Sequence, residues 1–85
     1  MSTPWQIELG QKLHNLRMEQ GLKLRELAQS ANMYWIELDR YERGEQTPDL
    51  HKLYMIAEIL NVSLHEILPP HAKEPEEYTH EQDQN

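Results

Sequence analysis

The sequence predicts an all-α fold of five helices in one domain. Apolar residues recur at helical spacing in successive segments, typical capping residues stand at the starts of these segments, and no segment shows the alternation of a strand. A chain of 85 residues also has room for only one modest hydrophobic core. We therefore expect a helical domain at residues 1–68, followed by a tail at residues 69–85.

The first helix is expected to begin at Thr3 and to continue until Gly21. Thr3 is the predicted N-cap, Pro4 occupies the first helical position, and Gln6 completes a capping box. The apolar residues of this segment share one helical stripe: Trp5, Leu9, Leu13 and Leu16. Such a stripe indicates a helix that buries one face against the rest of the domain.

The second and third helices are expected on either side of a tight turn at Asn32. The second covers about residues 24–31 and turns Leu27 and Ala28 inward. Asn32 suits the turn because asparagine tolerates the left-handed conformation better than other non-glycine residues. The third helix covers about residues 34–43. Its inward residues lie three positions apart and a glycine ends it: Leu38, Tyr41 and Gly44.

The fourth helix is expected after a loop at residues 45–48, with Asp49 as its N-cap and Asn61 at its end. Its apolar residues keep a helical period: Leu50, Leu53, Ile56, Ala57 and Leu60. Ser63 and Glu66 form a further capping box, which opens a fifth helix of one turn. Two consecutive prolines then stop the helix.

Charge and composition limit the possible functions. The formal net charge of −7 argues against a generic binder of polyanions. Residues 1–68 hold ten acidic and seven basic residues, whereas residues 69–85 hold five acidic residues and only Lys73. The tail is acidic and poor in large apolar residues, so we expect it to be disordered. The domain is only mildly acidic, which leaves room for a local basic face.

Other classes of protein have little support in the sequence. The absence of cysteine excludes disulfides and thiolate zinc sites and fits a reducing setting. No apolar run approaches the about 18 residues of a membrane span, and the N-terminus lacks a secretion signal, so we expect a cytoplasmic protein. None of the five histidines lies four residues from another, and no glycine-rich phosphate loop is present. We predict no metal, no cofactor and no enzymatic activity.

The most informative motif joins the second and third helices. Its segments are GLKLRELA at residues 21–28, NM at 32–33, LDRYERG at 38–44, PDL at 48–50, and Leu53. Ala28 stands where two helices must cross closely, and Asn32 supplies the turn between them. Met33 and Leu38 then pack the later helix onto the earlier one. This arrangement holds the third helix outward, where it can enter a groove of DNA.

With these motifs the sequence closely resembles the xenobiotic-response-element (XRE) group of lambda-repressor-like helix-turn-helix domains. The resemblance covers residues 9–68 and has no gap across the helix-turn-helix. It implies a transcriptional regulator that binds a double-stranded DNA operator with an inverted repeat as a homodimer, and it favours a repressor. It also implies that Arg17 pairs with Glu42 and ties the first helix to the third.

The same resemblance implies roles for individual residues. Base reading is implied for the start and outer face of the third helix: Tyr34, Trp35, Ile36, Glu37 and Arg40. Phosphate contacts are implied for Lys23, Arg25 and Arg43. Arg40 would pair with guanine, and Glu37 would accept a hydrogen bond from cytosine N4. Trp35 or Ile36 would pack on a thymine methyl group. The expected homodimer contact lies on the last helices: Leu64, Ile67 and Leu68.

Several residues depart from the family pattern and keep a second hypothesis open. Leu24 stands where many relatives have a glutamine that meets a phosphate, and Asp39 and Glu45 add negative charge near the presumed groove. Many relatives are polar at residues 34–36, where this chain reads YWI. Binding that depends on phosphate neutralisation should therefore be weak. Either the protein reads a thymine-rich site by apolar contact, or the exposed Trp35-Ile36 patch makes it a module that binds another protein.

Ordinary structural roles are also open for the charged residues. The two arginines of the third helix could pair with acidic residues three or four positions away, Arg40 and Arg43 with Glu37 and Asp39. Lys23 and Arg25 could be solvated surface charges, and Tyr34 could pack at the helix start. The sequence alone leaves these alternatives undecided.

Overall fold

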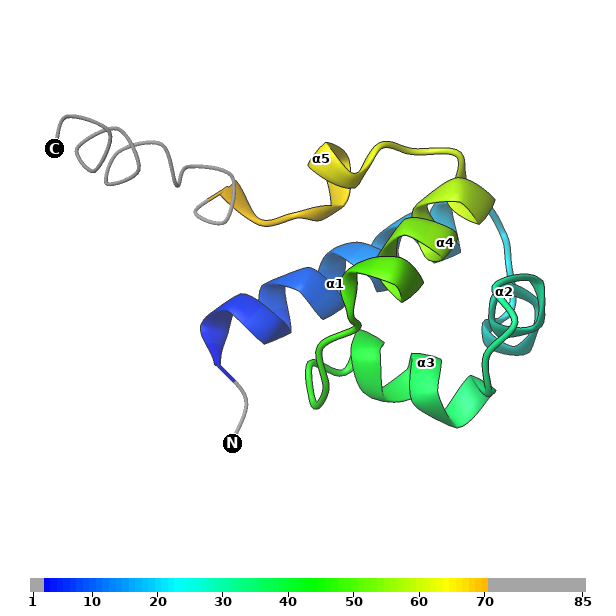
Figure 1. Ribbon diagram of the computed structural model, residues 1–85, viewed down its shortest axis with the longest axis horizontal. Helices are drawn as coiled ribbons and strands as arrows, with labels where there is room; N and C mark the ends of the chain where they lie inside the picture. Colours follow the sequence, from blue (N-terminus) through cyan, green and yellow to red (C-terminus); the bar gives the residue numbers. More distant parts are fainter. Residues whose placement is uncertain (1–2, 71–85) are drawn as a thin grey trace, which may run out of the picture.

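The computed structural model describes residues 3–70, and within this range it has five helices and no strand, as predicted (Figure 1). The helices are α1 (Pro4–Glu19), α2 (Leu24–Ser30), α3 (Trp35–Glu42), α4 (Leu50–Leu60) and α5 (Leu64–Ile67). Each lies within two residues of the expected bounds. Of the disordered tail predicted at residues 69–85, Pro69 is buried in the domain, and residues 71–85 lie outside the described residues.

The predicted capping interactions begin and end these helices. The Thr3 side chain accepts a hydrogen bond from the Gln6 amide over 3.1 Å, and the Gln6 side chain accepts from the Thr3 amide over 2.9 Å. Asp49 caps α4 by accepting from the Lys52 amide over 2.8 Å. The two asparagines predicted to end helices both adopt the left-handed conformation: Asn32 and Asn61, with φ of 58° and 59°.

The helices surround one apolar core. Figure 1 shows α1 running across the domain, with α3 below it in this view, α5 above it and α2 to the right. The buried apolar residues come from all five helices and from the C-cap of α2: Leu9, Leu13, Leu27, Ala28, Ala31, Leu38, Tyr41, Leu53, Ile56, Ala57, Leu60 and Ile67. This set contains most of the residues that the apolar patterns select. No helix within residues 3–70 has the length and the hydropathy that crossing a membrane requires.

Two apolar residues lie differently from the expectation. Leu50, expected on the apolar stripe of the fourth helix, is 70% exposed because it is the first residue of α4 and precedes the part that packs on the core. Ile67, expected to contribute to a homodimer contact, is fully buried in the core. Its side chain therefore has no surface to offer to a second copy, and that part of the prediction is corrected.

The tightest contact between helices joins α1 to the end of α3 at Gly10. A Cβ atom at this position would lie 2.4 Å from the carbonyl oxygen of Tyr41 and 2.6 Å from that of Glu42. A second glycine, Gly44, has a φ of 75° and lies against Ile7 of α1, where an added Cβ would be 2.8 Å from the Cα atom. The backbone at the end of α3 thus lies directly on α1, with no side chain between them.

We expect Gly10→Ala to lower the free energy of unfolding by about 1–3 kcal/mol, because the added methyl group meets backbone atoms that cannot rotate away. Urea denaturation followed by circular dichroism measures this loss. Gly21→Asn is the control, since Gly21 has nothing within 4 Å of an added Cβ and asparagine tolerates its φ of 70°. Equal stability of the two variants would contradict the close approach of α1 and α3.

Candidate nucleic-acid interface

A tight turn joins α2 to α3 and sets the direction of α3. The Met33 amide donates a hydrogen bond to the Ala28 carbonyl over 2.9 Å across the left-handed Asn32. Ala28 and Leu38 are both buried, so the inner face of α3 packs against α2 while its first turn points outward. The motif therefore forms the helix-turn-helix that the sequence predicts.

The predicted pair between Arg17 and Glu42 is present and ties α1 to α3. Arg17 donates to Glu42 twice, from Nε to Oε2 over 2.7 Å and from Nη2 to Oε1 over 3.0 Å. Its Nη1 also donates to the Leu22 carbonyl over 2.8 Å. His14 joins the cluster, with Nδ1 2.9 Å from Glu42 Oε1, a contact that the sequence analysis missed. Both pair members are almost fully buried, so the pair orients helices and does not face a ligand.

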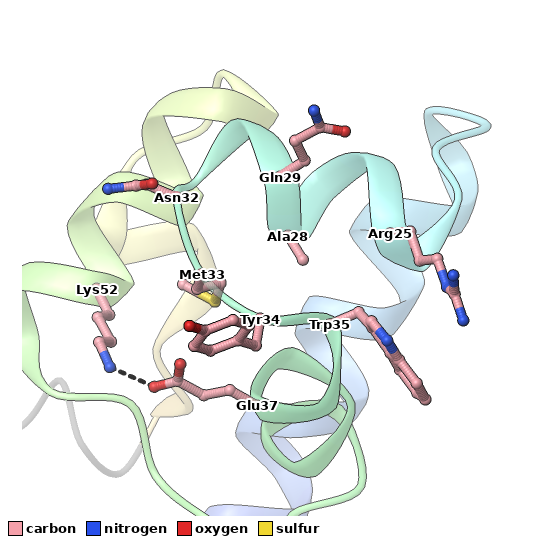
Figure 2. A pocket seen from close by; sticks show the side chains of 9 residues that line it. All are labelled: Arg25, Ala28, Gln29, Asn32, Met33, Tyr34, Trp35, Glu37 and Lys52. Atoms are coloured by element: carbon pink, nitrogen blue, oxygen red, sulfur yellow. Dashed lines mark hydrogen bonds and ion pairs between the residues drawn. The ribbon is translucent and has the colours of Figure 1, made fainter.

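The outer face at the start of α3 is aromatic and apolar. Tyr34, the N-cap residue, is 82% exposed, Trp35 is 39% exposed and Ile36 is 48% exposed. The Arg25 guanidinium of α2 lies 4.9 Å from the centroid of the Trp35 ring (Figure 2). This stacking joins a predicted phosphate contact to a predicted base reader and holds both side chains on the same side of the motif.

Glu37 does not lie free on this face. Its carboxylate accepts a hydrogen bond from the Tyr41 hydroxyl over 2.5 Å and forms an ion pair with Lys52 of α4 (Figure 2). The Lys52 ammonium and then the Tyr41 hydroxyl hold the pKa of Glu37 below its ordinary value. Burial, followed by the carboxylate of Glu37, raises the pKa of Tyr41. Both contacts are made by Oε2 of Glu37, so α3 and α4 already engage one of its two carboxylate oxygens. That Glu37 reads cytosine stays a prediction.

The cations around the helix-turn-helix differ in how free they are. Arg43 pairs with Asp39 over 3.1 Å and with Glu45 over 3.7 Å, which is the structural alternative to a phosphate contact that the sequence left open. Arg40 is exposed and forms no ion pair with any residue of the described range 3–70. Lys23 is also exposed, at the N-cap of α2. Arg40 and Lys23 are thus the cations most available to an anionic partner.

A broad open hollow of about 560 Å³ lies between α2, the turn and α3. Figure 2 shows Gln29 and Asn32 at its rim, together with the aromatic side chains at the start of α3. These two amides could also contact base edges or phosphates. The sequence analysis missed Gln29, although its position four residues after Arg25 places it on the same face of α2.

The remaining predictions concern the last helix and metal ions. Leu64 and Leu68 are half-buried against the core, which leaves part of each side chain at the surface. Between residues 3 and 70, no group of three or more metal-ligating side chains could hold a metal ion.

Comparisons with known proteins agree with this geometry. The helix-turn-helix family model matches residues 13–67. The HTH-type transcriptional regulator DdrOP3 of Deinococcus deserti is 32% identical over 62 residues, which are 73% of this chain and 48% of that protein. The chain thus spans about half of the length of this curated relative.

Two solved structures have similar folds. The restriction-modification controller protein C.AhdI from Aeromonas hydrophila matches with a TM-score of 0.71 and 26% identity over 73% of this chain and 94% of that chain. SinR, the master regulator for biofilm formation, solved in complex with DNA, matches with a TM-score of 0.64 and 36% identity. That match covers 67% of this chain and 92% of SinR.

The contacts of Glu37 with Lys52 and Tyr41 predict a specific pH dependence of stability. Because folding lowers the pKa of Glu37, its contribution is complete above the ordinary value of 4.5 and is lost as the pH falls through the lower folded-state pKa. We expect Glu37→Gln to be less stable than the wild type near pH 7 and the difference to shrink on acidification. Urea denaturation of both proteins over a pH series measures it. A difference that is constant from pH 7 to about pH 3 would contradict the ion pair with Lys52.

Proposed function

Since the chain belongs to the helix-turn-helix family of lambda-repressor-like (XRE) domains, we propose that it is a transcriptional regulator that recognises a specific duplex DNA sequence as a homodimer. The observation that carries this proposal is the outward first turn of α3, with exposed Tyr34, Trp35 and Ile36 followed by Arg40, which has no ion pair within residues 3–70. The protein acts by occupying DNA and not by catalysis.

In this proposal α3 enters the major groove, which is wide enough to admit one helix. Arg40 donates its hydrogen bonds to guanine O6 and N7, the commonest specific contact of arginine in that groove. Lys23 and the exposed side of Arg25 approach phosphates from α2. The pair between Arg17 and Glu42 keeps α3 in place, so little reordering is needed when DNA binds.

A homodimer extends the contact to an inverted repeat. Two copies of α3 would enter successive major grooves about 34 Å apart. We place the contact between copies at the exposed parts of Leu64 and Leu68. Leu64 lines a shallow hollow together with Tyr54 of α4, which is 56% exposed. Occupying a promoter in this way would repress transcription.

A second function has support from the same surface. Trp35 and Ile36 expose apolar side chains at the start of α3, and Arg43 is paired with its acidic neighbours Asp39 and Glu45. A helix-turn-helix with this face could bind another protein in place of DNA. Loss of partner binding on Trp35→Ala in the absence of DNA, with Arg40→Ala unaffected, would favour this alternative.

Selection from random duplex DNA, followed by fluorescence anisotropy on the selected site, tests the proposed function. We expect an inverted repeat to be enriched and Arg40→Ala to weaken binding by about fivefold or more, the effect of one lost base contact. Lys12→Ala is the matched control, because Lys12 is an exposed cation of α1 outside the helix-turn-helix. Absence of enrichment, and of binding even at low salt, would contradict DNA recognition and direct attention to a protein partner.

A further inference from the structure

Charged groups without an ion-pair partner are scarce on α3 within the described residues. Glu37 is held by Lys52 and Tyr41, and Arg43 and Asp39 pair with each other. Arg40 is therefore the one charged side chain of α3 that forms no ion pair within residues 3–70. The first turn of α3 instead presents the side chains of Trp35 and Ile36.

The apolar surface of Trp35 and Ile36, here called the first-turn surface, is ordered before any ligand arrives. The Arg25 guanidinium lies over one face of the Trp35 ring and restricts its rotation (Figure 2). Ile36 is β-branched and has one strongly preferred rotamer in a helix. A contact made by these two side chains thus loses little conformational entropy.

The major groove has only one apolar group that such a surface can recognise. Among the base edges, thymine alone carries a C5-methyl group, while the other groups in the groove are hydrogen-bond donors and acceptors. A cytosine methylated at C5 places the same methyl group at the same position on the pyrimidine ring. Both bases therefore present the chemistry that Trp35 and Ile36 match.

We propose that the first-turn surface reads pyrimidine C5-methyl groups, so that the protein distinguishes thymine and 5-methylcytosine from their unmethylated forms in the major groove. The inference rests on the proposed DNA binding and names the base chemistry that it selects. The exposed cations of the helix-turn-helix, Arg40 and Lys23, suit a polyanion and not an apolar partner. They would hold the duplex while the methyl contacts supply the discrimination.

Removing single methyl groups from the DNA provides the test. In the selected site, each thymine is replaced in turn by uracil, which removes only the methyl group, and affinity is measured by fluorescence anisotropy. We expect one or two positions in each half-site to lose about fourfold in affinity, the effect of one methyl group no longer buried. At the same positions, a cytosine·guanine pair carrying 5-methylcytosine should bind about fourfold more tightly than its unmethylated form.

Protein variants separate the first-turn surface from other contacts. Ile36→Ser removes the apolar side chain from the exposed first turn, so we expect the sensitivity to methyl groups to fall. Ile59→Ser is the matched control, because Ile59 is 38% exposed near the end of α4, outside the helix-turn-helix. It should keep both affinity and methyl sensitivity.

The outcomes are distinguishable. Equal affinity for thymine and uracil at every position, with tight binding of the duplex retained, would overturn the methyl-reading proposal and leave the proposed function intact. Sensitivity to the thymine methyl without any effect of 5-methylcytosine would overturn the extension to methylated cytosine. Failure to bind any duplex would overturn both proposals.

Discussion

The attachment of α3 to α1 is the constraint on which the rest of the structure depends. Gly10 brings the two backbones into direct contact, and the buried pair of Arg17 and Glu42 fixes their relative orientation about two turns further along α1. The left-handed Asn32 fixes the opposite end of α3. A short helix of eight residues has little stability of its own, so it keeps a defined direction only because both of its ends are held.

This arrangement separates the two faces of α3. Residues that hold the helix in place lie on its inner face and at its C-terminal end, and Glu37 of the first turn adds the ion pair with Lys52. Among the contacts described here, Trp35 and Ile36 of the first turn contribute only the stacking of Arg25 on Trp35. The charges near the helix are partly neutralised by each other, so attraction to phosphates is limited and shape and apolar contact must contribute more of the affinity.

The fold could be predicted from the sequence because its features are local. Capping boxes, left-handed asparagines and the apolar period of each helix depend on residues within four positions of one another, and all of them appear in the structure. Contacts across the fold were not predictable in the same way. Glu37 meets Lys52 fifteen residues away, and Ile67 turns fully into the core, and neither position has a pattern that distinguishes it from a surface residue. The pair of Arg17 and Glu42 was predictable only through the resemblance to the family.

The most direct test of the central claim, that the outer face of α3 is the binding surface, is a map of backbone amide chemical shifts on titration with the selected duplex. We expect the largest changes at residues 34–36 and at Arg40, with smaller ones at the start of α2. Exposed residues of α1 outside the helix-turn-helix, such as Lys12, should change little, and changes around Tyr54 and Leu64 would report dimer formation. Changes centred on α4, with the start of α3 unaffected, would contradict the claim.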